Sequence, residues 1–150
     1  MAELSLLEQF GQIRRLLNQL ATQAFREVDL GPLQATILRA IWKSETPSMT
    51  SLVKSLGGDP AAIGRTVDLL MKRGYVLKQR HPIDRRQWLL GLTPKGRGLA
   101  PKVDRIACEM VTVFAASLTA AERQQLERIQ ENLTTHLEAL VSGKARPVRS

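Results

Sequence analysis

The chain has 150 residues, of which 22 are Lys or Arg and 14 are Asp or Glu, so its formal net charge is +8. This length fits one compact domain, or one domain with an added dimerisation element. No apolar run approaches the roughly 18 residues of a membrane-spanning helix, and the N-terminus lacks the pattern of a secretory signal. We therefore expect a cytoplasmic protein with no membrane partner.

The excess positive charge lies entirely in the middle of the chain. Residues 51–107 contain twelve Lys or Arg and four Asp or Glu, whereas the segments on either side carry equal numbers of each sign. A basic centre between neutral ends favours a polyanionic partner, nucleic acid first and an anionic membrane second. Charge alone leaves open the alternative of a basic, solvated surface.

Apolar periodicity predicts two helices at the start of the chain. In the first, steps of four and three place one apolar stripe on Leu6, Phe10, Ile13, Leu17 and Leu20. Gly31 and Pro32 break this pattern. In the second helix, the predicted buried residues are Leu33, Ile37, Leu38, Ile41 and Trp42.

Two shorter helices follow, joined by a turn at Gly57 and Gly58. Ser48 is the predicted N-cap of the first, whose inner residues are Leu52, Val53 and Leu56. Asp59 and Pro60 predict the start of the second, which runs to about Arg73 and stops at Gly74, with an inward stripe of Ile63, Val67 and Leu70. Such a pair is typical of a helix-turn-helix, although plain packing units share the pattern.

A β-hairpin and two long helices complete the predicted elements. The strands are Tyr75–Arg80 and Gln87–Leu92, and Thr93 with Pro94 marks the next helix start. That helix has a stripe of Leu99, Val103, Ile106, Met110 and Val113, and we expect Pro101 to bend it or delay its regular bonding. Thr119 and Glu122 predict a capping box for the last helix, whose stripe is Leu126, Ile129, Leu133, Leu137 and Leu140.

The segment from Asp59 to Gly96 closely resembles the winged helix-turn-helix core of MarR-family transcriptional regulators. Its most specific part is Asp84-Arg85-Arg86 followed by Leu92-Thr93-Pro94-Lys95-Gly96, which matches the family's Asp-Arg-Arg wing tip and Leu-Thr-x-x-Gly pattern. Other positions where the family places similar residues are Gln34, Leu38, Leu118, Thr119 and Glu122. The resemblance covers most of residues 30–140, and the first helix agrees in character only.

This resemblance implies a mostly α fold with a small β-hairpin wing, in which a winged helix-turn-helix core carries N- and C-terminal dimerisation helices. The implied parts are a dimerisation helix at 1–30, a DNA-binding core at 31–96 and further dimerisation helices at 97–141. The small, basic segment 142–150 is predicted to be a disordered tail. The implied function is that of a homodimeric regulator of transcription, a repressor released by a small-molecule ligand.

In such a fold the fourth helix lies in the major groove of double-stranded DNA and the hairpin tip in the minor groove. The resemblance assigns the minor-groove contact to Arg86, and Asp84 is expected to pair with a neighbouring arginine. Arg65 has the reach for a guanine edge; its alternative is an ion pair with Asp68. The predicted DNA-binding residues are Ser48, Ala61, Ala62, Gly64, Arg65, Arg73, Arg80, Arg85 and Arg86.

The family often has Ser or Thr near the start of the fourth helix, where this chain has Ala61 and Ala62. Alanines offer methyl contacts but no side-chain hydrogen bonds. We therefore expect sparse base readout that relies on DNA shape.

The terminal helices carry apolar stripes that a small winged domain cannot bury alone. In the family such helices form a dimer, and the predicted dimerisation residues are Leu6, Phe10, Ile13, Leu17, Leu126, Ile129, Leu133 and Leu137. Two-fold symmetry predicts a near-palindromic operator with half-sites ~10 bp apart. Packing of these stripes within their own chain is the alternative.

Many family members also bind a small aromatic or phenolic ligand between the winged domain and the dimer helices. Aromatic side chains that are candidates for such a pocket are Phe10, Phe25, Trp42 and Phe114, although each is more often plain core. No ligand residues are assigned from the sequence.

No residue pattern predicts catalysis, a cofactor or a metal site. The histidines are His81 in the wing loop and His136 beside the last apolar stripe, and no glycine-rich phosphate loop or paired-carboxylate site is present. The one cysteine, Cys108, excludes an internal disulfide and is predicted to be a small buried residue. We expect a protein that is not an enzyme.

Two other functions remain as alternatives at this point. One is a non-specific, architectural DNA-binding protein, because the fourth helix has few hydrogen-bonding side chains. The other is a redox switch centred on Cys108.

Overall fold

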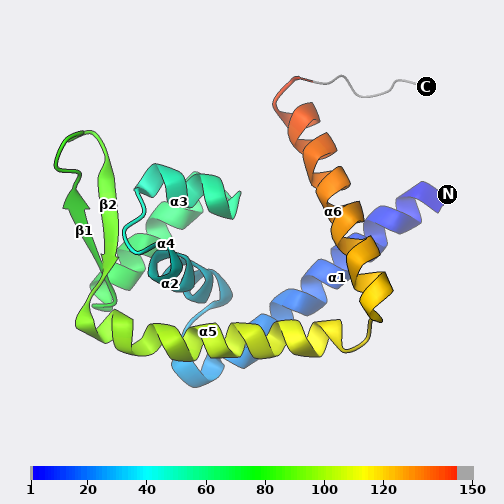
Figure 1. Ribbon diagram of the computed structural model, residues 1–150, viewed down its shortest axis with the longest axis horizontal. Coiled ribbons are helices and arrows are strands. Elements are labelled where there is room, and N and C mark those ends of the chain that lie inside the picture. Colours follow the sequence, from blue (N-terminus) through cyan, green and yellow to red (C-terminus); the bar gives the residue numbers. More distant parts are fainter. Residues whose placement is uncertain (1, 145–150) are drawn as a thin grey trace. The chain divides into compact units, whose positions relative to one another are not determined.

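The computed structural model describes the backbone of residues 2–144 and the side chains of residues 5–144; most of the predicted tail lies outside the described residues. Helices dominate, and one antiparallel hairpin interrupts them (Figure 1). In chain order the elements are α1 (Ala2–Ala24), the 3-10 helix η1 (Phe25–Val28), α2 (Pro32–Ser44), α3 (Met49–Leu56), α4 (Pro60–Lys72), β1 (Val76–Arg80), β2 (Trp88–Leu92), α5 (Pro94–Ala115) and α6 (Ala120–Val141). The predicted fold class, mostly α with a small hairpin, is confirmed.

Side-chain caps fix where the helix-turn-helix pair begins. Ser48 Oγ accepts a hydrogen bond from the Ser51 N–H at 3.0 Å and caps α3. The Asp59 carboxylate accepts hydrogen bonds from the N–H groups of Ala61 and Ala62 and caps α4. Each cap satisfies N–H groups that have no partner inside their helix, so both predicted helix starts are confirmed.

The last helix begins with the predicted capping box. Glu122 accepts a hydrogen bond from the Thr119 N–H at 2.7 Å, and Thr119 Oγ1 accepts one from the Glu122 N–H at 3.3 Å. The hydrogen bonds from the Thr119 backbone and side chain lower the pKa of Glu122. The charged form of Glu122 therefore stabilises the first turn of α6.

The wing is a two-stranded antiparallel hairpin. Its register runs from Val76 opposite Leu92 to Arg80 opposite Trp88. The segment before α3 adds a short pairing that the sequence does not predict, because the Leu90 N–H donates to the Pro47 carbonyl at 2.9 Å. This contact ties β2 to the start of α3.

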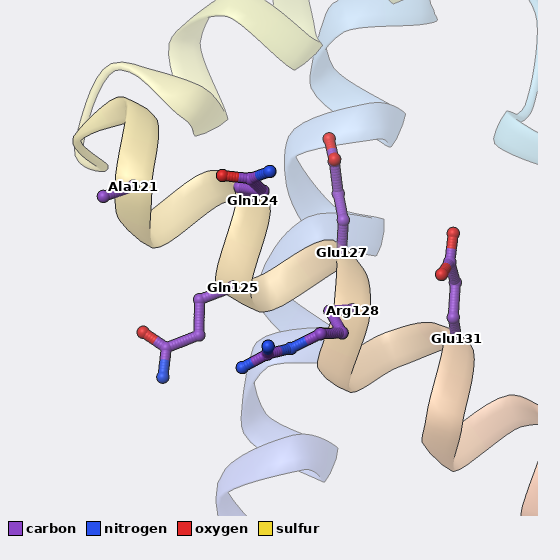
Figure 2. Close-up of a pocket in the computed structure, with 6 residues that line it drawn as sticks. All are labelled: Ala121, Gln124, Gln125, Glu127, Arg128 and Glu131. Atoms are coloured by element: carbon purple, nitrogen blue, oxygen red, sulfur yellow. The ribbon is translucent and has the colours of Figure 1, made fainter.

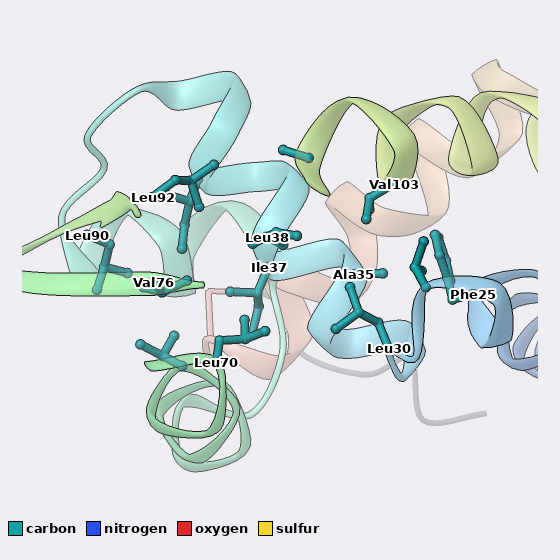
Figure 3. Close-up of a cluster of buried hydrophobic side chains, with 14 of the residues drawn as sticks. Phe25, Leu30, Ala35, Ile37, Leu38, Leu70, Val76, Leu90, Leu92 and Val103 are labelled. Atoms are coloured by element: carbon teal, nitrogen blue, oxygen red, sulfur yellow. The ribbon is translucent and has the colours of Figure 1, made fainter. Parts of the chain in front are cut away.

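The hydrophobic core surrounds α2 (Figure 3). Ile37, Leu38 and Ile41 on α2 are completely buried, as is Leu70 on α4. The remaining core residues come from η1, the η1–α2 connection, α2, α3, α4, both strands and the first half of α5; they are Phe25, Val28, Leu30, Ala35, Leu52, Ile63, Val67, Val76, Leu90, Leu92, Ala100, Val103 and Ile106. The core thus holds α4 and the hairpin on one common support.

Two predicted burials are wrong, and one short helix was not predicted. Leu33 is exposed because it lies on the first turn of α2, ahead of the buried face that begins at Ala35. Val113 is exposed because it lies beyond the part of α5 that packs on the core. The short 3-10 helix η1 had no predicting pattern in the sequence. The helix α5 includes Pro101 within its bounds.

The chain divides into two units within α5, between Met110 and Val111. The first unit contains the whole core, and the second contains the end of α5 and all of α6. No residue of α6 is buried. No helix in the described part of the chain is long and apolar enough to cross a membrane.

An ion-pair cluster joins α2 to α5. Asp104 accepts a hydrogen bond from Arg39 Nε at 2.6 Å and one from Lys43 Nζ at 3.0 Å. Only 18% of the Asp104 side chain is exposed. The hydrogen bond from Arg39, followed by that from Lys43, lowers the pKa of Asp104 below its ordinary value.

Replacing Asp104 with Asn is expected to lower the thermal stability near neutral pH and to flatten its dependence on acid pH. The folded-state pKa lies below the unfolded-state value, so the stabilisation is complete above the ordinary value of 3.8 and is lost as the pH falls through the folded-state pKa. Thermal unfolding followed by circular dichroism at a series of acid pH values checks this. The matched control is Glu109→Gln, which removes an exposed pair with Arg105 on the same helix. Parallel acid profiles for wild type and Asp104→Asn would show that the carboxylate contributes nothing.

Candidate nucleic-acid interface

The exposed face of α4 is the first part of the candidate interface. Ile63, Val67 and Leu70 hold the opposite face in the core. Outward from them lie the predicted residues Ala61, Ala62, Gly64 and Arg65, of which Ala61 and Arg65 are exposed and the other two half-buried. A Cβ at Gly64 would meet only the Met49 methyl group at 3.9 Å, so packing does not require glycine there.

Arg65 has a different partner from the one that the sequence suggests. Its Nη2 lies 4.0 Å from Asp59 Oδ2, and no ion pair with Asp68 is present among the described residues. Both side chains of the Arg65–Asp59 pair are more than 60% exposed. Such a pair is weak and screened by salt, so Arg65 stays available for another anion.

Unlike that of Arg65, the guanidinium of Arg73 already has close partners within the chain. Its Nη2 donates to Asp29 Oδ2 at 2.7 Å, and its Nη1 donates to the Asp29 carbonyl at 2.7 Å. Nη1 also lies 3.4 Å from Gln34 Oε1, which accepts the Gly31 N–H and so links the end of α4 to the start of α2. We therefore leave Arg73 out of the proposed DNA-binding surface, because its guanidinium is engaged in holding α4 on the domain.

The wing tip is built by main-chain hydrogen bonds to two side chains. His81 Nδ1 accepts hydrogen bonds from the N–H groups of Ile83 (3.2 Å) and Asp84 (3.0 Å). Asp84 Oδ1 accepts the Arg86 N–H at 3.1 Å. The predicted Asp84–arginine ion pair is absent among the described residues; Asp84 holds the backbone of Arg86 instead of a guanidinium.

The side chains of Arg85 and Arg86 are exposed, and within the described chain neither guanidinium has an ion-pair or hydrogen-bond partner. Arg80 differs, because its Nη1 donates to the Arg85 carbonyl at 2.7 Å and its guanidinium lies 3.9 Å from the centre of the Trp88 ring. Together with His81 and Pro82, Arg80 and Arg85 line a hollow of about 550 Å³. This hollow presents two cations to any anion that enters it.

The remaining predicted contact, Ser48, is half-buried at the start of α3. Its hydroxyl oxygen already caps α3, and its backbone bridges Leu89. Ser48 therefore places the N-terminus of α3 beside the hairpin.

The segment Leu92–Gly96 (Leu-Thr-Pro-Lys-Gly) connects the base of the wing to the end of α4 through hydrogen bonds. Thr93 Oγ1 donates to the Gly74 carbonyl at 2.6 Å and accepts the Gly96 N–H at 3.1 Å. Lys95 Nζ donates to the Arg73 carbonyl at 2.9 Å, and Gly96 packs directly against the Tyr75 backbone. The motif thus fixes the hairpin relative to α4, the two elements that the sequence assigns to DNA.

Sequence reasoning missed Ile83, which is 89% exposed at the wing tip. The only sequence feature that could have predicted this exposed apolar side chain is the presence of Pro82 and Ile83 in a basic loop. Proteins that bind the minor groove often insert apolar side chains between base steps.

The residues predicted for dimerisation present apolar surface. In α1 the side chains of Leu6, Phe10, Ile13 and Leu17 are exposed. In α6 Ile129, Leu133 and Leu137 are exposed and Leu126 is half-buried.

The polar face of α6 has a different chemistry from the wing. A hollow of about 500 Å³ on this helix is lined by Ala121, Gln124, Gln125, Glu127, Arg128 and Glu131 (Figure 2). Two carboxylates and one guanidinium give it no excess of positive charge. This face is therefore a poor site for a polyanion.

Cys108 is exposed, so its predicted burial is wrong. It lies on the side of α5 that faces away from Val103 and Ile106, which explains the exposure. Within residues 5–144 no group of three or more His, Cys, Asp or Glu side chains is placed to hold a metal ion.

Comparison with known proteins gives a consistent set of relatives. A model of the MarR family matches residues 30–88. The HTH-type transcriptional regulator BilQ of Clostridium symbiosum is 29% identical over 112 residues, which cover 75% of this chain and 76% of BilQ. The HTH-type transcriptional regulator YhbI of Bacillus subtilis is 28% identical over 106 residues, covering 71% and 69% of the two chains.

Solved structures share the same fold. A mutant of MarR from E. coli in complex with operator DNA gives a TM-score of 0.78 at 22% identity, covering 86% of this chain and 93% of that one. BpsR of Bordetella bronchiseptica, described with regulation of its DNA binding by 6-hydroxynicotinic acid, gives 0.77 at 22% identity, covering 85% and 91%. At these identities the likeness shows the winged-helix fold.

Proposed function

We propose that this chain, which a model of the MarR family matches over residues 30–88, is a MarR-type regulator of transcription that acts as a homodimeric repressor, binds a near-palindromic DNA site and is released by a small ligand. The observation that carries the proposal is the outward placement of cations on two elements held by one core. Arg65 lies on α4, and Arg85 and Arg86 lie at the wing tip. A helix and a hairpin so placed fit adjacent major and minor grooves of one duplex.

The proposed DNA-binding surface consists of Ser48, Ala61, Ala62, Gly64, Arg65, Arg85 and Arg86, and Arg80 lies beside it at the base of the wing tip. Ala61, Ala62 and Gly64 allow the backbone of α4 to approach the base edges closely. Because α4 offers few hydrogen-bonding groups, we propose that Arg65 reads one base position and that DNA shape supplies the remaining preference.

The exposed apolar side chains of α1 and α6 support a second copy of the chain as partner. A water-exposed stripe of Leu, Ile and Phe is costly, at about 25 cal/mol for each Å² of apolar surface. Burying it against an identical stripe removes that cost and gives the pair two-fold symmetry. Symmetry in turn matches two half-sites ~10 bp apart.

In the proposed mechanism a small ligand releases the protein from DNA. The support for it is the related BpsR, whose DNA binding is described as regulated by 6-hydroxynicotinic acid. The proposed ligand class is a small aromatic or phenolic compound, and no residues are assigned to it. Such a ligand acts only if it binds one spacing of the two α4 helices better than the other.

The proposal is tested by selecting a duplex from random sequence and comparing its affinity with that of a scrambled duplex at several salt concentrations. Specific regulators favour their site by about 10³-fold or more at physiological salt. We expect such a ratio together with a salt dependence that reflects several phosphate contacts. Equal affinities with a steep salt dependence would instead identify an architectural DNA-binding protein.

Replacing Arg65 with Ala is expected to weaken binding to the selected site by about 1–3 kcal/mol and to relax the preference at one base position. Repeating the selection with the variant checks both effects. A variant that selects the same sequence with the same affinity would remove Arg65 from the base-reading set.

A further inference from the structure

We propose that Arg80 is a positioning residue that clamps the wing tip and thereby orients the guanidinium groups of Arg85 and Arg86, instead of serving mainly as a phosphate contact. This inference rests on the proposed role of the wing in DNA binding. It assigns Arg80 a task different from the one that its positive charge suggests.

The first contact of the clamp is with Trp88. Arg80 and Trp88 are the last residue pair of the hairpin, so their side chains leave the same face of the sheet. Arg80 Cζ lies 3.9 Å from the centre of the Trp88 ring. At this distance the planar guanidinium packs against the indole, a contact that a lysine ammonium does not reproduce.

The second contact reaches into the loop. Arg80 Nη1 donates to the Arg85 carbonyl at 2.7 Å. One guanidinium therefore joins the end of β1, the start of β2 and the backbone of a tip residue. Arg85, whose carbonyl accepts this hydrogen bond, carries one of the two exposed guanidinium groups of the tip, and Arg86 carries the other.

The other loop groups complete the tip. The His81 N–H donates to the Gln87 carbonyl at 3.0 Å, and the Gln87 N–H donates to the Asp84 carbonyl at 3.0 Å. With the bonds to His81 Nδ1 and Asp84 Oδ1 described above, these hydrogen bonds hold the loop from His81 to Gln87. The bond from Arg80 adds a contact to the Arg85 carbonyl, which none of these other hydrogen bonds holds.

A tip ordered before binding improves affinity, because the loop loses less conformational freedom when it enters the groove. The clamp and a phosphate contact predict different behaviour for lysine. A lysine at position 80 keeps the charge and loses the planar stack. A phosphate contact tolerates that change, whereas a clamp does not.

The experiment compares Arg80→Lys and Arg80→Ala in the full-length protein. Amide hydrogen exchange of Ile83, Asp84 and Arg86 in the free protein reports on the tip, and thermal unfolding confirms that the fold is kept. We expect faster exchange at these amides in both variants. The matched control is Lys78→Gln, which removes a cation 5.3 Å from the same ring but has no hydrogen bond to the tip; its exchange should equal that of wild type.

Binding to the selected duplex is then measured in two backgrounds. In the wild-type background we expect Arg80→Lys to weaken binding by about 3- to 10-fold, close to the effect of Arg80→Ala. In a background that carries Arg85→Ala and Arg86→Ala, the Arg85 carbonyl and hence the clamp remain. There we expect neither change at position 80 to weaken binding further.

Several results would overturn the inference. Wild-type affinity for Arg80→Lys, or a loss for Arg80→Ala that persists without the tip guanidinium groups, would make Arg80 a direct contact. Unchanged exchange at the tip would show that no clamp exists. Faster exchange combined with wild-type binding when both tip arginines are removed would instead locate the failure in the proposed role of the wing in DNA binding.

Discussion

Replacing Arg86 with Ala is expected to weaken binding to the selected duplex by about 10- to 100-fold, because hydrogen bonds to charged groups contribute about 1.5–3 kcal/mol. Arg86 is exposed, its N–H is held by Asp84, and its guanidinium has no competing partner in the described chain. The loss should extend to most sequences, because the narrow minor groove attracts the cation through its potential as well as its bases.

Fluorescence anisotropy with the selected duplex and with scrambled DNA measures this effect. The matched control is Arg128→Ala, which removes the same charge from the polar face of α6 (Figure 2). Arg128→Ala should bind like wild type. Equal losses in the two variants would mean that net charge, and not the position of Arg86 at the wing tip, governs the affinity.

Replacing Gly96 with Ala is expected to destabilise the fold by about 3 kcal/mol, at the upper end of the usual cost of overpacking. A Cβ at this position overlaps the carbonyl oxygen of Tyr75, which is backbone and cannot move aside alone. That carbonyl accepts the Thr93 N–H at 3.1 Å. Separating α5 from Tyr75 therefore also disturbs the junction that fixes the wing relative to α4.

Urea unfolding followed by circular dichroism measures this change. Gly98→Ala is the matched control on the same helix, because a Cβ there meets nothing within 4 Å. It should stabilise the protein by about 0.5–1 kcal/mol, since alanine is the better helix former. If Gly96→Ala unfolds at the same urea concentration as wild type, the close approach of α5 to Tyr75 is not required.

The elements were predictable because their signals are local. Ser48, Asp59 and Thr119 each cap a helix within three residues, and the apolar stripes repeat with the helical period. The short pairing of Pro47 with Leu90 was missed because it depends on how two distant segments meet.

Individual site residues were harder to predict, because long-range partners decide what a charged side chain does. Arg73 pairs with Asp29, which lies 44 residues away, and no local sequence pattern predicts this pair. The Arg80 guanidinium packs on the indole of Trp88, and only the register of the hairpin places these two residues opposite each other. By contrast Arg85 and Arg86 stay exposed at the tip, where the sequence placed them.

The most direct test of the account is the composition and footprint of the complex with the selected duplex, measured by sedimentation and hydroxyl-radical protection. The account predicts two chains on each duplex and two protected half-sites whose centres lie about 10 bp apart. A complex of one chain with a single protected segment would contradict it.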